Sequence, residues 1–184
     1  HGRMPVWIAV GGTPQSVARA GAYGLPLALA IIGGTPARYA PLFDLYREAA
    51  RRAGQDSAKL KTSINVHGFI ADTTAAAADI FYGPQAEVMN RIGRERGWGP
   101  TSRAQFDQSI GPDGHLFLGD PETVARKIVA HWKIFRNDRF LLQMAIGPMP
   151  HDHILRGIEL YGTRVAPLVR EMLAETKAQA EASA

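Results

Sequence analysis

The sequence predicts an α/β fold in which helices cover a parallel sheet. Apolar runs alternate with segments of helical periodicity along the 184 residues. These runs are continuously apolar instead of alternating apolar and polar, which is typical of strands buried on both faces. The tetrapeptide Gly-Gly-Thr-Pro also follows the first two apolar runs, at residues 11–14 and 33–36. Two architectures fit these observations: a doubly wound sheet and part of a (β/α)8 barrel.

Strands and helices are expected to alternate along the chain. The runs that predict strands are residues 5–10, 26–32, 60–71, 115–118 and 139–146. The helices that follow them are expected at residues 13–23, 35–54, 72–96, 120–135 and 150–173. One face of the second helix is predicted to pack against the sheet, because its apolar residues have helical spacing: Tyr39, Leu42, Phe43, Tyr46 and Ala50. Gly54 is expected to end this helix in the left-handed conformation.

Cap residues and prolines predict where the helices begin. Thr13 and Thr35 are each followed by a proline, which suits the first position of a helix because no N–H is needed there. Asp120 stands before Pro121 in the same way, and the fourth helix is therefore expected to start with a carboxylate cap.

Prolines and glycines also predict interruptions. The dipeptide at residues 83–84 is expected to divide the third helix, and Pro167 to kink or break the last one near residues 163–167. Residues 97–114 contain four glycines and two prolines and are expected to form an irregular insertion. Residues 177–184 are expected to fray. The length suits a single domain over residues 1–184.

Composition excludes several classes of protein. Apolar residues make up 46% and charged residues 21%, an ordinary globular balance, and no apolar run reaches the roughly 18 residues of a membrane span. The absence of cysteine excludes disulfides and thiolate metal sites, and the cytoplasm is the expected compartment. The net charge is +4, but Lys and Arg are scattered among acidic residues, so no nucleic-acid partner is expected. A mildly basic surface suits an anionic small ligand.

The first Gly-Gly-Thr-Pro turn has the residues of a phosphate site. Gly11 and Gly12 allow backbone N–H groups to approach a ligand, and Thr13 and Ser16 add hydroxyl groups at the start of a helix. The same residues also make a sound turn and cap without a ligand, and both interpretations stay open. The second turn has no hydroxyl in the following helical turn. Neither turn is a GxGxxG fingerprint or a P-loop.

Several segments resemble one known family in the right order. These are PVWIAVGGTPQSVARAGAYGLPLALAIIGG, LYREAARRAGQD, GDPETVARKI and IELYGTRVAPLVREM. Together they resemble the carboxyl-terminal half of a luciferase-like flavin-dependent monooxygenase, over residues 5–173. The resemblance implies a (β/α)8 barrel with a late insertion, of which this chain would hold strands 5 to 8. It also implies FMN as cofactor, with coenzyme F420 as the alternative.

The resemblance places the flavin phosphate at the first turn. Gly11, Gly12, Thr13 and Ser16 match the family's phosphate-binding residues by position. Bacterial luciferases carry an acidic residue where Gly12 stands, so at this one position the contact with the phosphate would be through the backbone alone. The first four strands of a barrel have no counterpart in the chain. It is therefore expected to be a fragment, to have lost that half, or to associate with another chain, such as a second copy.

Histidines are the remaining candidates for chemistry. His67, late in the strand at 60–71, is a weak catalytic candidate at the mouth of the barrel, with a half-buried structural role as the alternative. His151 and His153 are two residues apart at a helix start, where their side chains face apart, so no metal site is expected. His115 and His131 are better explained by packing.

The function that these observations favour is that of a flavin-dependent monooxygenase. It would act on a small organic substrate with reduced flavin and oxygen, and a separate reductase is a candidate source of the flavin. The flavin would carry out the chemistry, and the protein would bind and orient it. Two alternatives stay open: a non-catalytic half-barrel and another phosphate-binding α/β enzyme.

Overall fold

The structure is a computed structural model that describes residues 4–182. The chain divides into two compact units. Unit 1 comprises the residues up to Val66 together with Trp132–Leu141, and unit 2 comprises His67–His131 and the residues from Leu142 onward. The strand β3 (Thr62–Ile70) and the helix α5 (Pro121–Phe135) each contribute residues to both units.

Unit 1 contains parallel strands joined by helices. β1 (Ile8–Val10) pairs with β2 (Leu27–Ala30), and β2 pairs with the first half of β3, both in parallel. The helix α1 (Pro14–Ala22) connects β1 to β2, and α2 (Ala40–Arg52) lies between β2 and β3. The predicted α/β fold with parallel strands is confirmed. The strands are shorter than the apolar runs that predict them, and the prolines that start the first two runs lie outside the strands.

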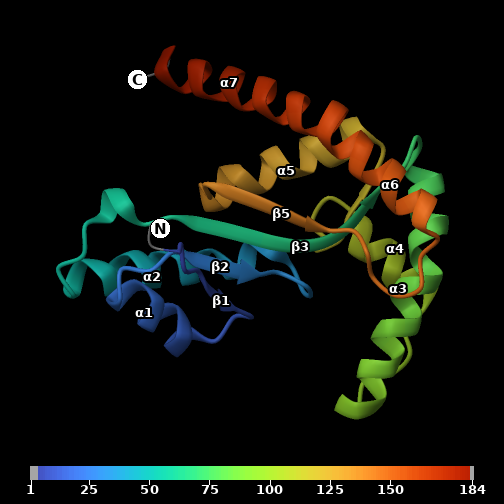
Figure 1. The fold of residues 1–184 in the computed structure, drawn as a ribbon, viewed down its shortest axis with the longest axis horizontal. Helices are drawn as coiled ribbons and strands as arrows, with labels where there is room; N and C mark the ends of the chain where they lie inside the picture. The colour runs from blue at the N-terminus through green and yellow to red at the C-terminus, as the bar shows by residue number, and fades with distance from the viewer. Residues whose placement is uncertain (1–3, 183–184) are drawn as a thin grey trace. The chain divides into compact units, whose positions relative to one another are not determined.

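The core of unit 1 forms where α1 packs closely on α2 (Figure 1). Gly21 permits this approach, because a Cβ at that position would clash with the carbonyl oxygen of Tyr46. Of the face predicted from helical spacing, Phe43, Tyr46 and Ala50 are buried, whereas Tyr39 and Leu42 are only partly buried. The Tyr46 hydroxyl donates to the carbonyl of Leu25 at 2.9 Å. Burial, assisted by the charge of Asp138, raises the pKa of Tyr46 to about 12.

The segment 132–141 completes unit 1. The ring of Phe135 lies 5.2 Å from that of Phe43. Asp138 accepts hydrogen bonds from the backbone N–H of Thr62 and from the ammonium of Lys61, both at 2.9 Å. These bonds hold the start of β5 (Arg139–Gln143) beside β3, with which β5 pairs.

Unit 2 contains the second half of β3, its parallel partner β4 (Phe117–Gly119) and most of the helices. The helices are α3 (Thr74–Arg96), α4 (Arg103–Ile110), α5, α6 (His151–Leu160) and α7 (Ala166–Ala182). Large apolar side chains with less than 2% exposure, among them Phe69, Phe81, Phe106 and Phe117, form its core. Asp120 caps α5 and Pro121 is its first residue, as predicted.

The third helix is not divided at the Gly-Pro dipeptide. α3 begins after the cap Thr73, whose hydroxyl accepts from Ala76 N–H at 3.1 Å, and continues through Pro84 to Arg96. A proline removes one helical hydrogen bond, but it does not stop a helix that tertiary packing holds on both sides. Phe81 and Gln85 are both buried and supply that packing.

The segment 97–114 is not irregular throughout, because it contains α4. Ser102 and Gln105 form a reciprocal capping box at the start of this helix. Phe106 is almost fully buried, and its ring lies 5.1 Å from that of Tyr82 on α3. The glycines and prolines that suggested an irregular insertion flank the helix and do not enter it.

Near residues 163–167, where a kink or break is expected, the helix changes its hydrogen-bonding pattern without ending. A π-helical turn, η3 (Tyr161–Val165), links α6 to α7, and Pro167 is the second residue of α7. α7 continues to Ala182, so most of the segment expected to fray is helical, and residues 183 and 184 lie outside the described part. Among residues 4–182, no helix has the length and the apolar character needed to cross a membrane.

Candidate functional site

The first Gly-Gly-Thr-Pro turn lies at the carboxyl end of β1 and leads directly into α1. Gly12 has φ 107°, a conformation that favours glycine. Thr13 is the N-cap residue in an extended conformation, as predicted, but its hydroxyl makes no capping hydrogen bond. The backbone N–H groups of Gly12, Thr13 and Gln15 have no acceptor among residues 4–182. The turn therefore presents unused donors at the positive end of a helix dipole.

Ser16 lies in the first turn of α1, next to these donors. Its backbone N–H donates to the carbonyl of Thr13 at 3.1 Å, and its hydroxyl oxygen accepts from the guanidinium of Arg19 at 3.2 Å. The hydroxyl hydrogen stays available to a ligand, and Arg19 adds a positive charge one turn along. The four residues predicted from the sequence thus lie together at one helix start, where the chemistry suits an anion.

The second Gly-Gly-Thr-Pro turn lies at the same edge of the sheet. β1 and β2 are parallel neighbours, with Val10 opposite Leu29, so both turns follow carboxyl ends. Here Pro36 begins a short 3-10 helix, η1 (Pro36–Tyr39), and the hydroxyl of Thr35 makes no capping bond. The helical cap predicted from the repeat is therefore present in backbone conformation but not in side-chain hydrogen bonding.

Tyr39 connects the two turns. Its hydroxyl donates to the carbonyl of Gly33 at 3.1 Å. Its ring lies against Gly12, where an added Cβ would come within 3.3 Å of the Tyr39 Cε1 atom. The sequence placed Tyr39 only on the apolar face of the second helix and did not connect it with the two turns. The signal that could have found it is the repetition of one turn after two consecutive strands, since the turns of neighbouring parallel strands meet at one edge.

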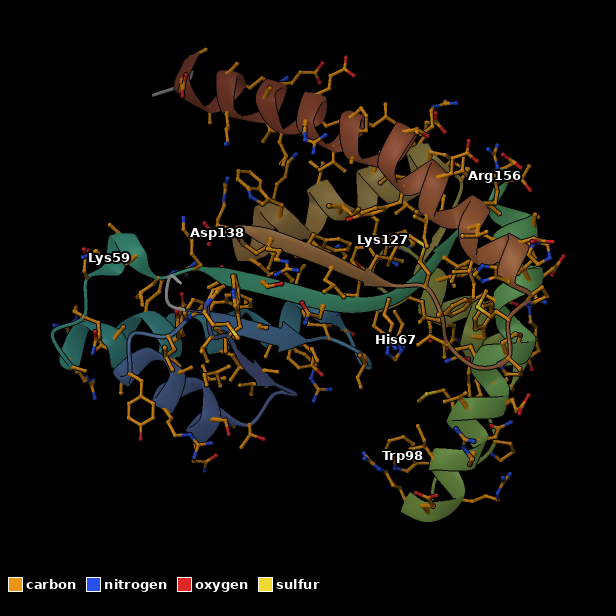
Figure 2. The ribbon with its side chains drawn as sticks, in the orientation of Figure 1. Lys59, His67, Trp98, Lys127, Asp138 and Arg156 are labelled. Carbon is orange, nitrogen blue, oxygen red and sulfur yellow. The ribbon has the colours of Figure 1, made fainter. Side chains whose placement is uncertain are left out.

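His67 lies in unit 2, on the second half of β3 (Figure 2). It is half-buried, and burial lowers its pKa. The same unit contains His115, whose pKa is lowered to about 4 by burial and then by electrostatic repulsion from the protonated forms of His67 and Lys127. Both imidazoles are therefore neutral near pH 7. Each can donate or accept a hydrogen bond, which keeps His67 a candidate for proton transfer.

Lys127 is a buried cation with a structural role, because it binds backbone carbonyl groups. Its ammonium donates to the carbonyl oxygens of Ile110, Gly111 and Leu116, at 3.3, 2.6 and 2.8 Å. Burial lowers its pKa to about 8. His131, one turn further along α5, is buried, and its Nδ1 lies 2.8 Å from the carbonyl of Lys127. This environment agrees with the packing role expected for His131.

Asp120 belongs to the scaffold of unit 2. Its carboxylate accepts from the N–H of Thr123 at 2.8 Å, from the hydroxyl of Thr123 at 2.9 Å and from the hydroxyl of Thr74 at 2.6 Å. Burial raises the pKa of Asp120, but these hydrogen bonds outweigh it and hold the pKa at about 2. The neighbouring acid, Glu122, instead bonds Arg164 at 3.1 Å.

The two histidines at the start of α6, His151 and His153, are exposed. Within residues 4–182, no group of three or more His, Asp and Glu side chains is placed to hold a metal ion.

A parallel α/β sheet with a glycine-rich turn before a helix is a common frame for binding phosphorylated small molecules. The sequence profile described as "Luciferase-like monooxygenase" matches residues 1–135. The chain belongs to the luciferase-like monooxygenase family. No curated protein matches its sequence closely enough to add to this.

Solved structures share the fold at low sequence identity. The monooxygenase RslO1 from Streptomyces bottropensis has a TM-score of 0.66 at 21% identity, over 88% of this chain and 47% of its own. The oxygenating constituent of 3,6-diketocamphane monooxygenase from Pseudomonas putida was solved in complex with FMN. It has a TM-score of 0.65 at 19% identity, over 89% of this chain and 48% of its own. The F420-dependent tetrahydromethanopterin reductase from Methanopyrus kandleri has a TM-score of 0.61 at 18% identity, over 89% of this chain and 50% of its own. The chain thus spans about half the length of these proteins.

Proposed function

We propose that the chain is the carboxyl-terminal half of the (β/α)8 barrel of a flavin-dependent monooxygenase, with strands 5 to 8 of that barrel. Membership of the luciferase-like family supports this, as does the coverage of about half of each similar structure. The parallel order of β1, β2 and β3, with helices between them, is the repeating unit of such a barrel.

The first turn is the proposed site of the FMN phosphate. The main support for this site is that the backbone N–H groups of Gly12, Thr13 and Gln15, at the start of a helix, have no acceptor within the described residues. The hydroxyl groups of Thr13 and Ser16 would add two further hydrogen bonds, and Arg19 a nearby positive charge. A structure of similar fold was solved with FMN bound.

FMN would supply the redox chemistry with oxygen, and these residues would anchor and orient it. A phosphate held by backbone N–H groups fixes one end of the cofactor without a proton transfer. His67 is the proposed candidate for a proton-handling role, on the grounds of its half-buried, neutral ring. Coenzyme F420 is the alternative cofactor, since another structure of similar fold depends on it.

The test of the phosphate site is the double variant Thr13→Val with Ser16→Ala. FMN binding, followed by the quenching of its fluorescence, should weaken by about 1–3 kcal/mol, the usual loss for hydrogen bonds to a charged group. Riboflavin, which lacks the phosphate, should bind the variant as it binds the parent chain. Thr35→Val is the matched control, because it changes the equivalent threonine of the second turn and should leave both affinities unchanged.

Equal weakening of both flavins, or of neither, would show that the phosphate lies elsewhere. A chain that binds sugar phosphates and ignores flavin would instead be another phosphate-binding α/β enzyme, and one that binds neither would be a non-catalytic half-barrel. The same proposal includes a small organic substrate and a flavin reductase as partners. It also includes association with a second copy or with a missing half, and a cytoplasmic location.

A further inference from the structure

The side chain of Tyr39 lies between two backbone turns that are separated in sequence. Its ring atoms Cε1 and Cδ1 lie 3.3 and 4.0 Å from where a Cβ of Gly12 would stand. Its hydroxyl is bonded to the carbonyl of Gly33 at 3.1 Å. Tyr39 is half-buried, and all three residues belong to unit 1. The ring therefore covers the bare Cα face of Gly12 while the hydroxyl fixes the ring to the neighbouring turn.

Gly12 needs such a support. A glycine populates a wider range of backbone conformations than any other residue, and ordering it costs correspondingly more. Its φ of 107° is one conformation among several open to it. The N–H groups of Gly12 and Thr13 can hold a phosphate only while both point the same way. Because the Tyr39 ring packs against Gly12, the turn has fewer conformations to lose when a phosphate binds. This preorganisation raises the affinity of the turn for the phosphate.

The hydrogen bonding of Tyr39 argues against direct contact with the phosphate. A phenol has one hydrogen to donate, and here it goes to Gly33. The remaining lone pairs would face the phosphate oxygens with like charge. The guanidinium of Arg38 lies over the face of the Tyr39 ring, 5.4 Å from its centre, and adds a cation–π contact to the ring. Tyr39 can thus act on the ligand only through Gly12.

We infer that Tyr39 is a positioning residue that sets the preference of the first turn for a phosphorylated flavin over an unphosphorylated one. This inference rests on the proposed function, because it takes the first turn as the phosphate site. It assigns a role to the second Gly-Gly-Thr-Pro turn, which binds no ligand itself but supplies the anchor and the side chain that hold the first.

The experiment compares the affinities for FMN and for riboflavin in four forms of the full chain: the parent, Tyr39→Ala, Tyr39→Phe and Tyr23→Ala. Tyr23 is the matched control, since it is 66% exposed and follows the far end of α1. Tyr39→Ala should weaken FMN binding about tenfold, as expected if the loosened turn loses one of its backbone hydrogen bonds to the phosphate, and should leave riboflavin binding unchanged. Tyr39→Phe keeps the ring and should lose about threefold. Tyr23→Ala should change neither.

A second readout separates positioning from general damage. In amide NMR spectra without ligand, Tyr39→Ala should shift the resonances of Gly12 and Thr13, while those of unit 2 stay in place. If the alanine variant does not fold, Tyr39→Leu, which keeps an apolar side chain but removes the ring and hydroxyl, takes its place with the same expected loss.

The outcomes distinguish the two proposals. If the parent prefers FMN and the Tyr39 variants keep the full preference, the role of Tyr39 is wrong and the phosphate site stands. If the parent shows no preference for FMN, the phosphate site itself is wrong, and the role of Tyr39 fails with it. A loss of FMN affinity in Tyr23→Ala as large as that in Tyr39→Ala would also overturn the inference.

Discussion

Individual polar residues differ widely in how much of their hydrogen-bonding capacity the fold uses. Asp120 accepts three hydrogen bonds, which join the starts of α3 and α5 through Thr74 and Thr123. Asp44 instead forms one ion pair of 3.4 Å with Arg47, and its side chain is 81% exposed. Hydrogen bonds to a partly buried carboxylate contribute far more to stability than an exposed ion pair does.

Asp120→Ala should lower the free energy of unfolding by about 2 kcal/mol, because it removes the cap of α5 and leaves two threonine hydroxyls without their acceptor. Urea unfolding at pH 7 measures the change. The control Asp44→Ala should stay within about 0.5 kcal/mol of the parent. The affinity for FMN should not change in either variant. Equal stability of the two variants would show that the three bonds contribute nothing beyond a surface pair.

At the scale of elements, close backbone contacts decide where helices continue and where loops can pass. α3 runs through Pro84, and the loop after β5 approaches the Pro84 carbonyl at Gly147. Gly147 has φ 72°, and a Cβ there would clash with the Pro84 carbonyl oxygen. In the π-helical turn before α7, by contrast, a Cβ on Gly162 would have no heavy atom within 4 Å. A side chain is therefore excluded at Gly147 but has room at Gly162.

Gly147→Ala should destabilise the chain by about 2 kcal/mol or more, since it adds both a strained φ and a clash with backbone. Gly162→Ala should stabilise it by about 0.5–1 kcal/mol, because alanine loses less entropy in a helical conformation. Thermal unfolding of the two variants in the same buffer tests both signs. A neutral Gly147→Ala would mean that the loop can move away from α3 without cost.

At the scale of the whole molecule, buried histidines make stability sensitive to acid. Burial lowers the pKa of His67, His115 and His131, for His115 to about 4. Between that value and the ordinary value of 6.5, the unfolded chain binds a proton at His115 that the folded chain does not. Stability is therefore lost as pH falls from about 6.5 toward 4, with a slope of at most about 1.4 kcal/mol per pH unit for each such group.

His115→Asn should make this decline shallower, because it removes the group with the largest proton difference among the three. The measurement is the urea midpoint at several pH values between 7 and 4. Asp120 has little effect on the change in stability between pH 7 and 4. Because its pKa in the folded chain is about 2, the stability that it contributes is lost at lower pH. An unchanged decline in the variant would assign the acid sensitivity to other groups.

The sequence by itself determined the order of the strands and of all the long helices, the parallel α/β class and the position of the turn after β1, although it missed α4 and divided α3. These follow from short-range signals. Apolar runs, helical periodicity and cap residues such as Asp120 act on the chain within a few residues of their own position. The resemblance to the luciferase-like family rests on segments of the same local kind, and the family profile that matches residues 1–135 confirms it.

Only the tertiary structure decided which of these local signals prevailed. Packing around Phe81 carried α3 through Pro84, and the burial of Phe106 made a helix inside a glycine-rich segment. The contact of Tyr39 with Gly12 likewise joins residues 27 positions apart by number. Such contacts depend on the register of β1 and β2, which brings two turns to one edge. The energy of packing between distant residues is not encoded in any short stretch of sequence, and so it appears only when the chain is folded.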